Sequence, residues 1–322
     1  MVVVLGLAAI LAAVWTFDVF SESDEALMRR VQGIFAPLDV ESVSADSPEF
    51  QRIAVGRKLF FDTRLSKDGT TSCASCHQPA HYGTDPNPQS LGVFKKLTPR
   101  NTQAVLNLRY HRVVHWTGDR ESLEDQAIRS FTDPGGLANS TEKEALSKLS
   151  QAGYRETLAS AADALALYQR TLVTKNSAFD RFLRGDIEAL TKDQKNGLRQ
   201  FLHLGCVACH TGVAFGAKDM IRFGLTRDYW TVTGSAPKAD GQHDLGRQGV
   251  TGNSNDRNVF KIPSLRNVAM TAPYFHDGSA KDLATAIRWM GELQLDRKLT
   301  EREVHELKSF LESLTGEPPN WN

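Results

Sequence analysis

The sequence has no cysteine outside two short motifs. All four cysteines lie in Cys73-Ala74-Ser75-Cys76-His77 and Cys206-Val207-Ala208-Cys209-His210. No thiol is left over to pair with another part of the chain, which argues against structural disulfides. Whatever the cysteines do must therefore be explained by the motifs themselves.

The chain also lacks an excess of charge of either sign. Lys and Arg together number 38, as do Asp and Glu, so the formal net charge is zero. A neutral chain has no overall field that would attract nucleic acid or an anionic membrane surface, and we expect no nucleic-acid partner. A local charged patch that docks a small redox protein is compatible with this balance.

The apolar run at the N-terminus, Val2–Phe17, is too short to be a typical membrane span. It contains about 16 residues, whereas a spanning helix needs ~20. Its Leu- and Ala-rich composition resembles the hydrophobic region of an export signal, although no Lys or Arg precedes it. Residues 1–21 are therefore interpreted as a signal peptide or as an uncleaved N-terminal anchor.

Strand patterns are scarce, and most of the sequence has helical or loop character. Thr141, Thr191 and Thr300 each stand three residues before Glu or Gln, the capping-box pattern that opens a helix. Helices are expected over Ala161–Lys175 and over Glu301–Leu314, where apolar residues recur at helical spacing.

A long loop is expected over residues 231–258, because this segment is rich in Gly, Asn, Asp and Ser. Loops of this length in compact domains are often functional.

Each cysteine motif is the attachment signature of a c-type haem. The two thiols can form thioethers to the porphyrin vinyl groups, and the adjacent imidazole then binds the iron. Alternatively, a Cys-x-x-Cys pair could be a redox dithiol, and two such pairs with two histidines could hold zinc. A His directly after the second Cys in both copies favours haem. Because haem c is attached outside the bacterial cytoplasm, the motifs and the N-terminal segment together predict a periplasmic location.

The motifs lie 133 positions apart (73 to 206), which predicts one haem in each of two domains. A weak internal repeat supports this division, since Gly56–Phe60 precedes the first motif and Gly197–Phe201 precedes the second. Both segments predict a helix whose Gly and Phe pack near a haem edge. We expect an N-terminal domain over residues 22–176 and a C-terminal domain over residues 177–322.

Further segments resemble the bacterial di-haem cytochrome c peroxidases and their relative MauG. The resemblance runs from about residue 56 to about residue 316 and is carried by Gly56–Asp62, Leu65-Ser66, Pro99–Thr102, His115-Trp116, Leu123–Gln126, Ile262–Val268 and Thr271–Gly278. It implies a mainly α fold of two cytochrome c-like helical domains, each around one covalently bound haem c, with a calcium ion between them. It also implies a homodimer.

The resemblance implies a role for each matching haem residue. Cys73 and Cys76 would attach the N-terminal haem, where peroxide binds, and Cys206 and Cys209 the C-terminal haem, which receives electrons. The proximal iron ligands would be His77 and His210. Met290 would be the distal ligand of the second iron, and a thioether ligand raises the reduction potential.

The remaining implied roles lie between the haems and on the peroxide side. Trp116 would lie between the haems, and Gln126 on the side where peroxide binds. Asn101, with the backbone oxygens of Thr271 and Pro273, would bind calcium. Judged without the resemblance, Met290 and Trp116 would be core residues, Gln126 a solvated helix residue and Asn101 a turn or cap residue.

Two positions depart from the family pattern. Val93 stands where a distal His is usual, so the N-terminal iron is expected to be five-coordinate unless His81 or His111 takes that place. Gly136 stands where a catalytic Glu is usual. General acid–base catalysis typically contributes ~10²–10⁴ in rate. If the loop folds differently, one of three nearby acidic residues could replace this Glu: Asp133, Glu142 or Glu144.

The sequence therefore predicts a periplasmic di-haem peroxidase that reduces hydrogen peroxide to water, with electrons from a small cytochrome c or a cupredoxin. Two alternatives stay open. One is a MauG-like enzyme that oxidises residues of a partner protein, which the absence of a distal His favours and Met290 disfavours. The other is an electron-transfer or peroxide-sensing protein of low activity, which the absence of the catalytic Glu favours.

Overall fold

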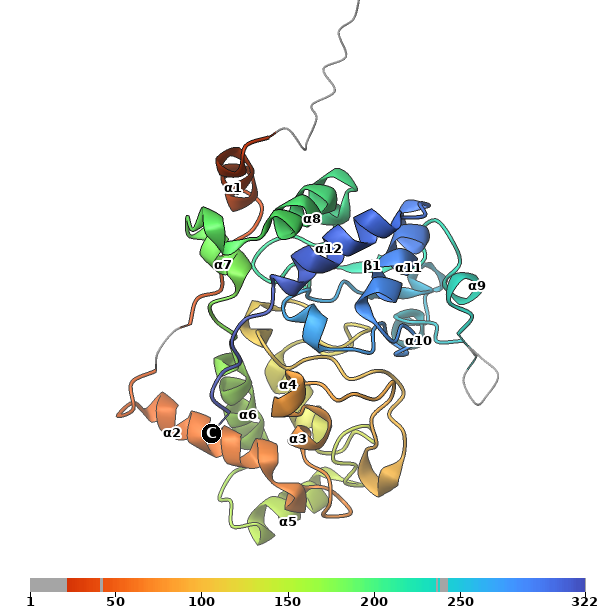
Figure 1. Cartoon of the computed structure of the whole chain (residues 1–322). Helices are drawn as coiled ribbons and strands as arrows, with labels where there is room; N and C mark the ends of the chain where they lie inside the picture. Colours follow the sequence, from red (N-terminus) through yellow and green to blue (C-terminus); the bar gives the residue numbers. More distant parts are fainter. Residues whose placement is uncertain (1–21, 41–42, 236, 238–242, 322) are drawn as a thin grey trace, which may run out of the picture.

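The computed structural model describes residues 22–40, 43–235, 237 and 243–321, and the expected signal or anchor at 1–21 lies outside them. Helices dominate, and they form two lobes (Figure 1). In the described part of the chain, no helix is long and apolar enough to cross a membrane.

The lower lobe in Figure 1 carries the first cysteine motif. Its helices are α2 (Pro48–Phe61), α3 (Cys73–Cys76), α4 (Leu123–Ser130), α5 (Glu142–Gln151) and α6 (Leu158–Thr171).

The upper lobe carries the second motif. Its helices are α1 (Asp24–Gln32), α7 (Ala178–Leu183), α8 (Lys192–His203), α9 (Tyr229–Thr233), α10 (Gln248–Thr251), α11 (Leu283–Leu295) and α12 (Glu301–Glu312). Strand β1 (Met220–Arg222) pairs antiparallel with β2 (Val259–Lys261), placing Ile221 opposite Phe260.

The three threonines expected to open helices all do so. Thr191 and Thr300 form complete capping boxes at the starts of α8 and α12. Thr141 caps α5 by accepting a hydrogen bond from the Glu144 N–H, but the Glu144 carboxylate accepts from the Ser140 N–H instead of completing the box. The local sequence thus fixes these helix starts.

Two expectations about helix extent need correction. The helix expected over 161–175 runs from 158 to 171, because the chain leaves helical geometry at Leu172 and Lys175 pairs with Glu317. The segment 231–258 is not wholly loop, since it holds the end of α9 and all of α10. Asp228 starts α9 by accepting a hydrogen bond from the Thr231 N–H, and Tyr229 is buried.

A glycine lets the two main helices of each lobe cross closely. A Cβ atom on Gly56 of α2 would lie 1.9 Å from the backbone oxygen of Ala164 on α6. A Cβ atom on Gly197 of α8 would lie 1.8 Å from that of Glu306 on α12. The weak repeat in the sequence therefore marks equivalent helix crossings, in which each glycine faces the backbone of the other helix.

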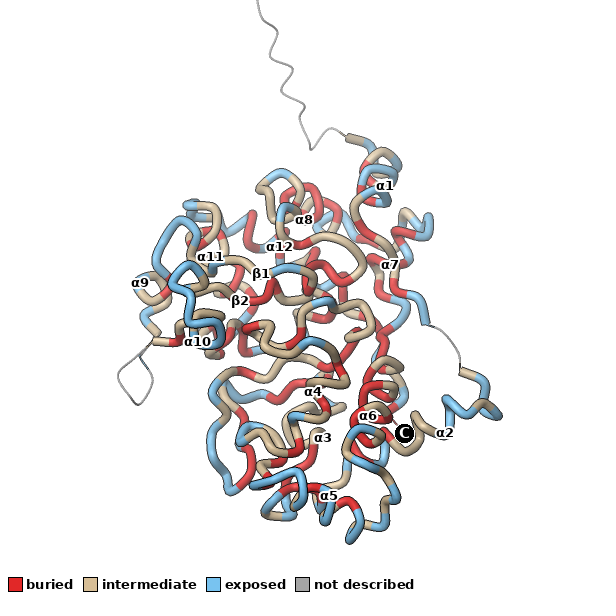
Figure 2. The backbone as a smooth tube through the Cα atoms, turned by 180° about the vertical axis from the view of Figure 1, so that it is seen from behind, coloured by how far each residue is buried: buried red, intermediate tan, exposed pale blue. Residues whose placement is uncertain are grey.

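A segment near each end of the chain packs in the lobe formed mainly by the other half of the sequence. Leu27, Val31 and Phe35 precede α2 but pack in the hydrophobic core of the upper lobe. Trp321, at the other end, packs in the core of the lower lobe. Figure 2 shows buried backbone in both lobes. A boundary at residues 176 and 177 therefore does not separate the two cores, since residues 22–35 pack with the C-terminal half.

A buried ion pair fastens the N-terminal segment to the upper lobe. Arg266 Nη1 lies 2.8 Å from Asp180 Oδ1, and both side chains are almost fully buried. The same carboxylate accepts hydrogen bonds from the Leu38 N–H and the Ser177 hydroxyl, while Arg266 also donates to the Ala36 carbonyl oxygen. One carboxylate thus joins three separate segments of the chain.

We expect Asp180→Asn to destabilise the protein by about 3–5 kcal/mol, because it leaves the buried Arg266 charge without its partner. The free energy of unfolding can be measured by urea titration. Asp193→Asn is a suitable control, because Asp193 is exposed and its ion pair with His305, at 3.4 Å, lies at the surface. Similar losses for both variants would contradict a special role for the buried pair.

Candidate haem sites

Each cysteine motif forms one short helical turn before its histidine. The first is α3 and the second is a 3₁₀ turn over Cys206–Ala208. Nδ1 of His77 lies 3.0 Å from the Gly83 carbonyl oxygen, and Nδ1 of His210 lies 3.0 Å from the Phe215 carbonyl oxygen. A ring whose Nδ1–H donates to a carbonyl keeps Nε2 as the atom that can bind a metal.

Burial keeps both imidazoles in the form that binds iron. Desolvation lowers the pKa of His77 and of His210 below the usual range, so both rings are neutral at neutral pH. The two histidines therefore match what proximal iron ligands require.

The cysteines do not fit the two alternatives to haem. Burial raises the pKa of Cys73 to about 12 and that of Cys206 to about 11, whereas a reactive dithiol needs a lowered pKa. Among the described residues, which include both motifs, no three His, Cys, Asp or Glu side chains come together to hold a metal ion. The residues present fit covalent attachment of one porphyrin at each motif.

A second, much clearer repeat relates the lobes at an offset of 160 residues. Asn107 and Asn267 share φ of 62°, and Gly118 and Gly278 have φ of 60° and 68°. Each glycine closes a hairpin whose ends pair, Val114 with Arg120 and Tyr274 with Ala280. Helices α4 and α11 then begin at Leu123 and Leu283. The repeat is visible in the sequence as asparagines, glycines and leucines at equal spacing, a signal that sequence analysis had missed.

Each repeated hairpin accepts a backbone hydrogen bond from the opposite lobe. The Asn101 N–H donates to the His276 carbonyl oxygen at 2.8 Å, and the Lys261 N–H donates to the Trp116 carbonyl oxygen at 2.7 Å. At the offset of 160, Asn101 corresponds to Lys261 and Trp116 to His276. The side-chain amides of Asn107 and Asn267 both reach the Thr174 hydroxyl at 3.2 Å. The lobes are thus joined by a pseudo-symmetric pair of backbone bonds.

The same offset shows where the two sites differ. Met290 on α11 corresponds to Ser130 on α4, and the Ser130 hydroxyl donates to the Ala127 carbonyl oxygen within its own helix. At this position the upper lobe therefore offers a thioether and the lower lobe does not.

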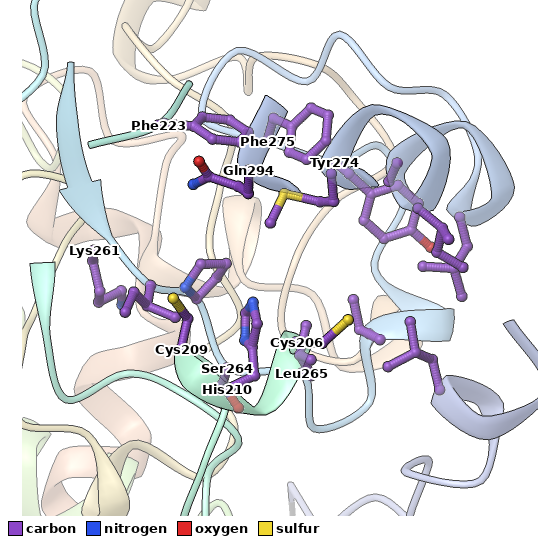
Figure 3. A pocket seen from close by; sticks show the side chains of 18 of the residues that line it. Cys206, Cys209, His210, Phe223, Lys261, Ser264, Leu265, Tyr274, Phe275 and Gln294 are labelled. Carbon is purple, nitrogen blue, oxygen red and sulfur yellow. The ribbon is translucent and has the colours of Figure 1, made fainter. Parts of the chain in front are cut away.

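A cavity of about 370 Å³ adjoins the second motif. Its lining is mostly apolar and includes Phe201, Cys206, Cys209, His210 and Met290. Figure 3 shows the His210 ring between the two cysteines, with Tyr274, Phe275, Phe223 and Gln294 on the far side and Lys261 at one edge. A flat apolar group attached to both cysteines would be enclosed between α11 and the motif.

Trp116, Asn101, Thr271 and Pro273 all line this cavity where the lobes meet. Trp116 Nε1–H donates to the Asn101 carbonyl oxygen at 2.9 Å, and its ring centroid lies 6.4 Å from that of His276. The Asn101 side-chain amide donates to the Asn87 carbonyl oxygen. The structure thus brings together the tryptophan and the three residues expected to bind calcium.

Gln126 lies on α4 and is partly buried. Its Oε1 is buried without a hydrogen-bond partner in the structure. An unsatisfied buried carbonyl is costly, so the site suits a water or a polar ligand. The plain interpretation of Gln126 as a solvated residue is therefore wrong.

Val93, at the position of the usual distal His, points its side chain into the protein, and a valine cannot bind iron. Val93 is buried, and Leu91 pairs with Leu97 on either side of it. His81 is exposed, and His111 lines the cavity of the upper lobe.

Gly136 has no room for a side chain, because a Cβ atom would lie 2.5 Å from the Ser130 carbonyl oxygen. Asp133, next to it, accepts a hydrogen bond from Arg120 Nη2 at 2.6 Å. Glu142 and Glu144 lie in the first turn of α5. Of these three acidic residues, Asp133 is the closest in sequence to Gly136, and Arg120 holds its carboxylate.

Comparisons with known proteins agree on one family. Residues 50–188 match the family described as di-haem cytochrome c peroxidase. The cytochrome c551 peroxidase of Nitrosomonas europaea is 37% identical over 88% of this chain and 85% of that protein. The cytochrome c551 peroxidase of Pseudomonas aeruginosa is 34% identical over 92% and 88% of the two chains. The methylamine utilization protein MauG of Methylorubrum extorquens is 32% identical over 95% and 89%.

Solved structures show the same fold. The crystal structure of a MauG-like protein associated with microbial copper homeostasis is 25% identical, with a TM-score of 0.69 over 87% of this chain and 94% of that one. The diheme peroxidase BthA from Burkholderia thailandensis has a TM-score of 0.69 at 18% identity, over 88% and 90% of the two chains. The second likeness concerns the fold alone.

Proposed function

Because the chain belongs to the di-haem cytochrome c peroxidase family, we propose that it reduces hydrogen peroxide to water in the periplasm, with electrons from a small cytochrome c or a cupredoxin. It is an oxidoreductase of the cytochrome c peroxidase type, and its family implies two haem c groups. The observation that carries the proposal is the difference between the two sites: Met290 in the upper lobe corresponds to Ser130 in the lower.

In this proposal each lobe holds one haem and has a different role. Cys73, Cys76 and His77 would hold one haem and Cys206, Cys209 and His210 the other. When bound, the haems supply the redox-active iron. Met290 would complete the second site and favour its reduced form, since a thioether raises the reduction potential.

The lower lobe would bind the substrate. Gln126 has a buried carbonyl without a partner and can accept a hydrogen bond from peroxide or water. Arg120 donates a hydrogen bond to Asp133, which orients that carboxylate, and Asp133 is our candidate to replace the missing Glu in proton transfer.

The interface between the lobes would hold calcium. Asn101, Thr271 and Pro273 line one cavity and offer uncharged oxygens, the kind of ligand that Ca²⁺ accepts together with water. Trp116, bonded to Asn101, would lie between the two haems. A homodimer is the assembly that we propose by analogy with the family.

The test is a steady-state assay of the purified full-length protein with peroxide and a reduced small cytochrome c, without prior reduction. Because Val93 cannot bind iron, we expect turnover from the first mixing, and one high-spin with one low-spin haem in the EPR spectrum. Two low-spin haems and no turnover would contradict the proposal.

A second candidate function is the oxidation of residues in a partner protein. Val93 favours it, because an open iron needs no activation, and MauG of Methylorubrum extorquens is among the relatives. Peroxide-dependent mass shifts on a co-expressed neighbouring protein, without turnover of cytochrome c, would favour this function. If neither activity is detected, electron transfer or peroxide sensing is the remaining function.

A further inference from the structure

Lys261 carries a charge into the cavity of the upper lobe. It lies on β2, is 4% exposed, and its side chain stands at the edge of the cavity that holds His210 (Figure 3). No carboxylate of the described residues forms an ion pair with it. Burial lowers the pKa of Lys261 to about 7, with no acidic neighbour to oppose the effect.

Two arginines on this side of the molecule already have carboxylate partners. Arg100 donates to both oxygens of Asp244, and Arg266 pairs with Asp180. A buried ammonium without a counter-charge costs several kcal/mol in real proteins. An anion that is not part of the polypeptide would therefore stabilise the ammonium group of Lys261 in this cavity.

His111 lines the same cavity and adds a hydrogen-bond donor. Both of its ring nitrogens are buried without a hydrogen-bond partner in the structure. Burial lowers the pKa of His111 well below its usual range, and the charge of Lys261 adds to this effect, so the ring is neutral and offers one N–H. Lys261 and His111 together can bind one carboxylate, through a charge and through a hydrogen bond.

A covalently held haem c brings carboxylates of its own, its two propionates. We propose that Lys261, assisted by His111, binds a propionate of the haem attached to Cys206 and Cys209 and so raises the reduction potential of that haem. This inference rests on the proposed function, because it requires haem at the second motif.

The pseudo-symmetry of the lobes indicates why the effect would concern one haem. The residue that corresponds to Lys261 in the lower lobe is Asn101, which is neutral. Both backbones make the equivalent bond to the opposite hairpin, so the difference lies in the side chain. A cation near one iron only would stabilise the reduced form of the electron-accepting haem and leave the other unchanged.

The experiment is a spectroelectrochemical titration of the holoprotein and of Lys261→Gln, Lys261→Arg and Lys281→Met. For Lys261→Gln we expect the ratio of reduced to oxidised second haem at a fixed potential to fall about tenfold, which is 59 mV for a one-electron couple. Lys261→Arg should keep the ratio within about twofold, because it retains the charge. Lys281→Met removes an exposed lysine of the same lobe and should change nothing.

An unchanged midpoint in Lys261→Gln would overturn the proposal. If that variant does not fold, the midpoint of His111→Phe decides, since it should fall by a smaller amount in the same direction. The titration needs no peroxide turnover. A protein with two haems, an unchanged midpoint and normal turnover would therefore reject the role of Lys261 alone, whereas a protein without covalent haem would reject the proposed function.

Discussion

Met290→Leu is expected to lower turnover with a cytochrome c donor by about 100-fold, because it removes the distal ligand that we propose for the second haem. Leucine keeps the volume of the side chain, so α11 should pack as before. Loss of the thioether lowers the reduction potential of the haem. For a one-electron couple, 59 mV is a tenfold change in the equilibrium ratio of reduced to oxidised haem, so a fall of ~120 mV is a hundredfold change in that ratio.

Two measurements check this result. The EPR spectrum of the variant should show two high-spin haems, and the potential of the second haem should fall. Met270→Leu serves as the control, because Met270 is exposed and lies outside the cavity. If Met290→Leu kept a low-spin second haem and full turnover, Met290 would be a core residue, as its position on α11 alone suggests.

The second large effect concerns stability. Gly197→Ala places a Cβ atom 1.8 Å from the Glu306 carbonyl oxygen and 2.7 Å from the Phe310 Cβ. Neither neighbour is the flexible end of a side chain, so α8 and α12 must move apart. We expect a loss of about 3 kcal/mol or more in the free energy of unfolding, measured by urea titration with circular dichroism.

Gly249→Ala is the matched control for this change. Gly249 lies on the exposed helix α10, and a Cβ atom there would meet nothing within 4 Å. Its stability should stay within about 1 kcal/mol, since alanine is tolerated wherever the backbone geometry is ordinary. Equal losses at both positions would mean that the close crossing of α8 and α12 does not limit stability.

The sequence predicted what depends on short-range signals. The motifs at Cys73 and Cys206 carry their chemistry in five consecutive residues, and the caps at Thr191 and Thr300 act over three. The mainly helical fold follows from such signals together with the resemblance to a family.

The rest depends on contacts between distant segments. Nothing local indicates that Phe35 packs in the upper lobe, because its burial is decided by Phe179 and Phe215 more than a hundred residues away. Lys261 was missed for the same reason. A lysine in a strand is usually exposed, and only the tertiary contacts of β2 and the cavity show that Lys261 is buried. The repeat at 160 residues was present in the sequence but is spread over isolated positions.

The two backbone bonds between the lobes have a consequence for electron flow. Each hairpin is held by a main-chain amide of the opposite lobe, and such a bond does not depend on the identity of the side chain. If Trp116 lies between the two haems as proposed, we expect exchange of its side chain to change the rate of electron transfer while these main-chain bonds keep the lobes in place.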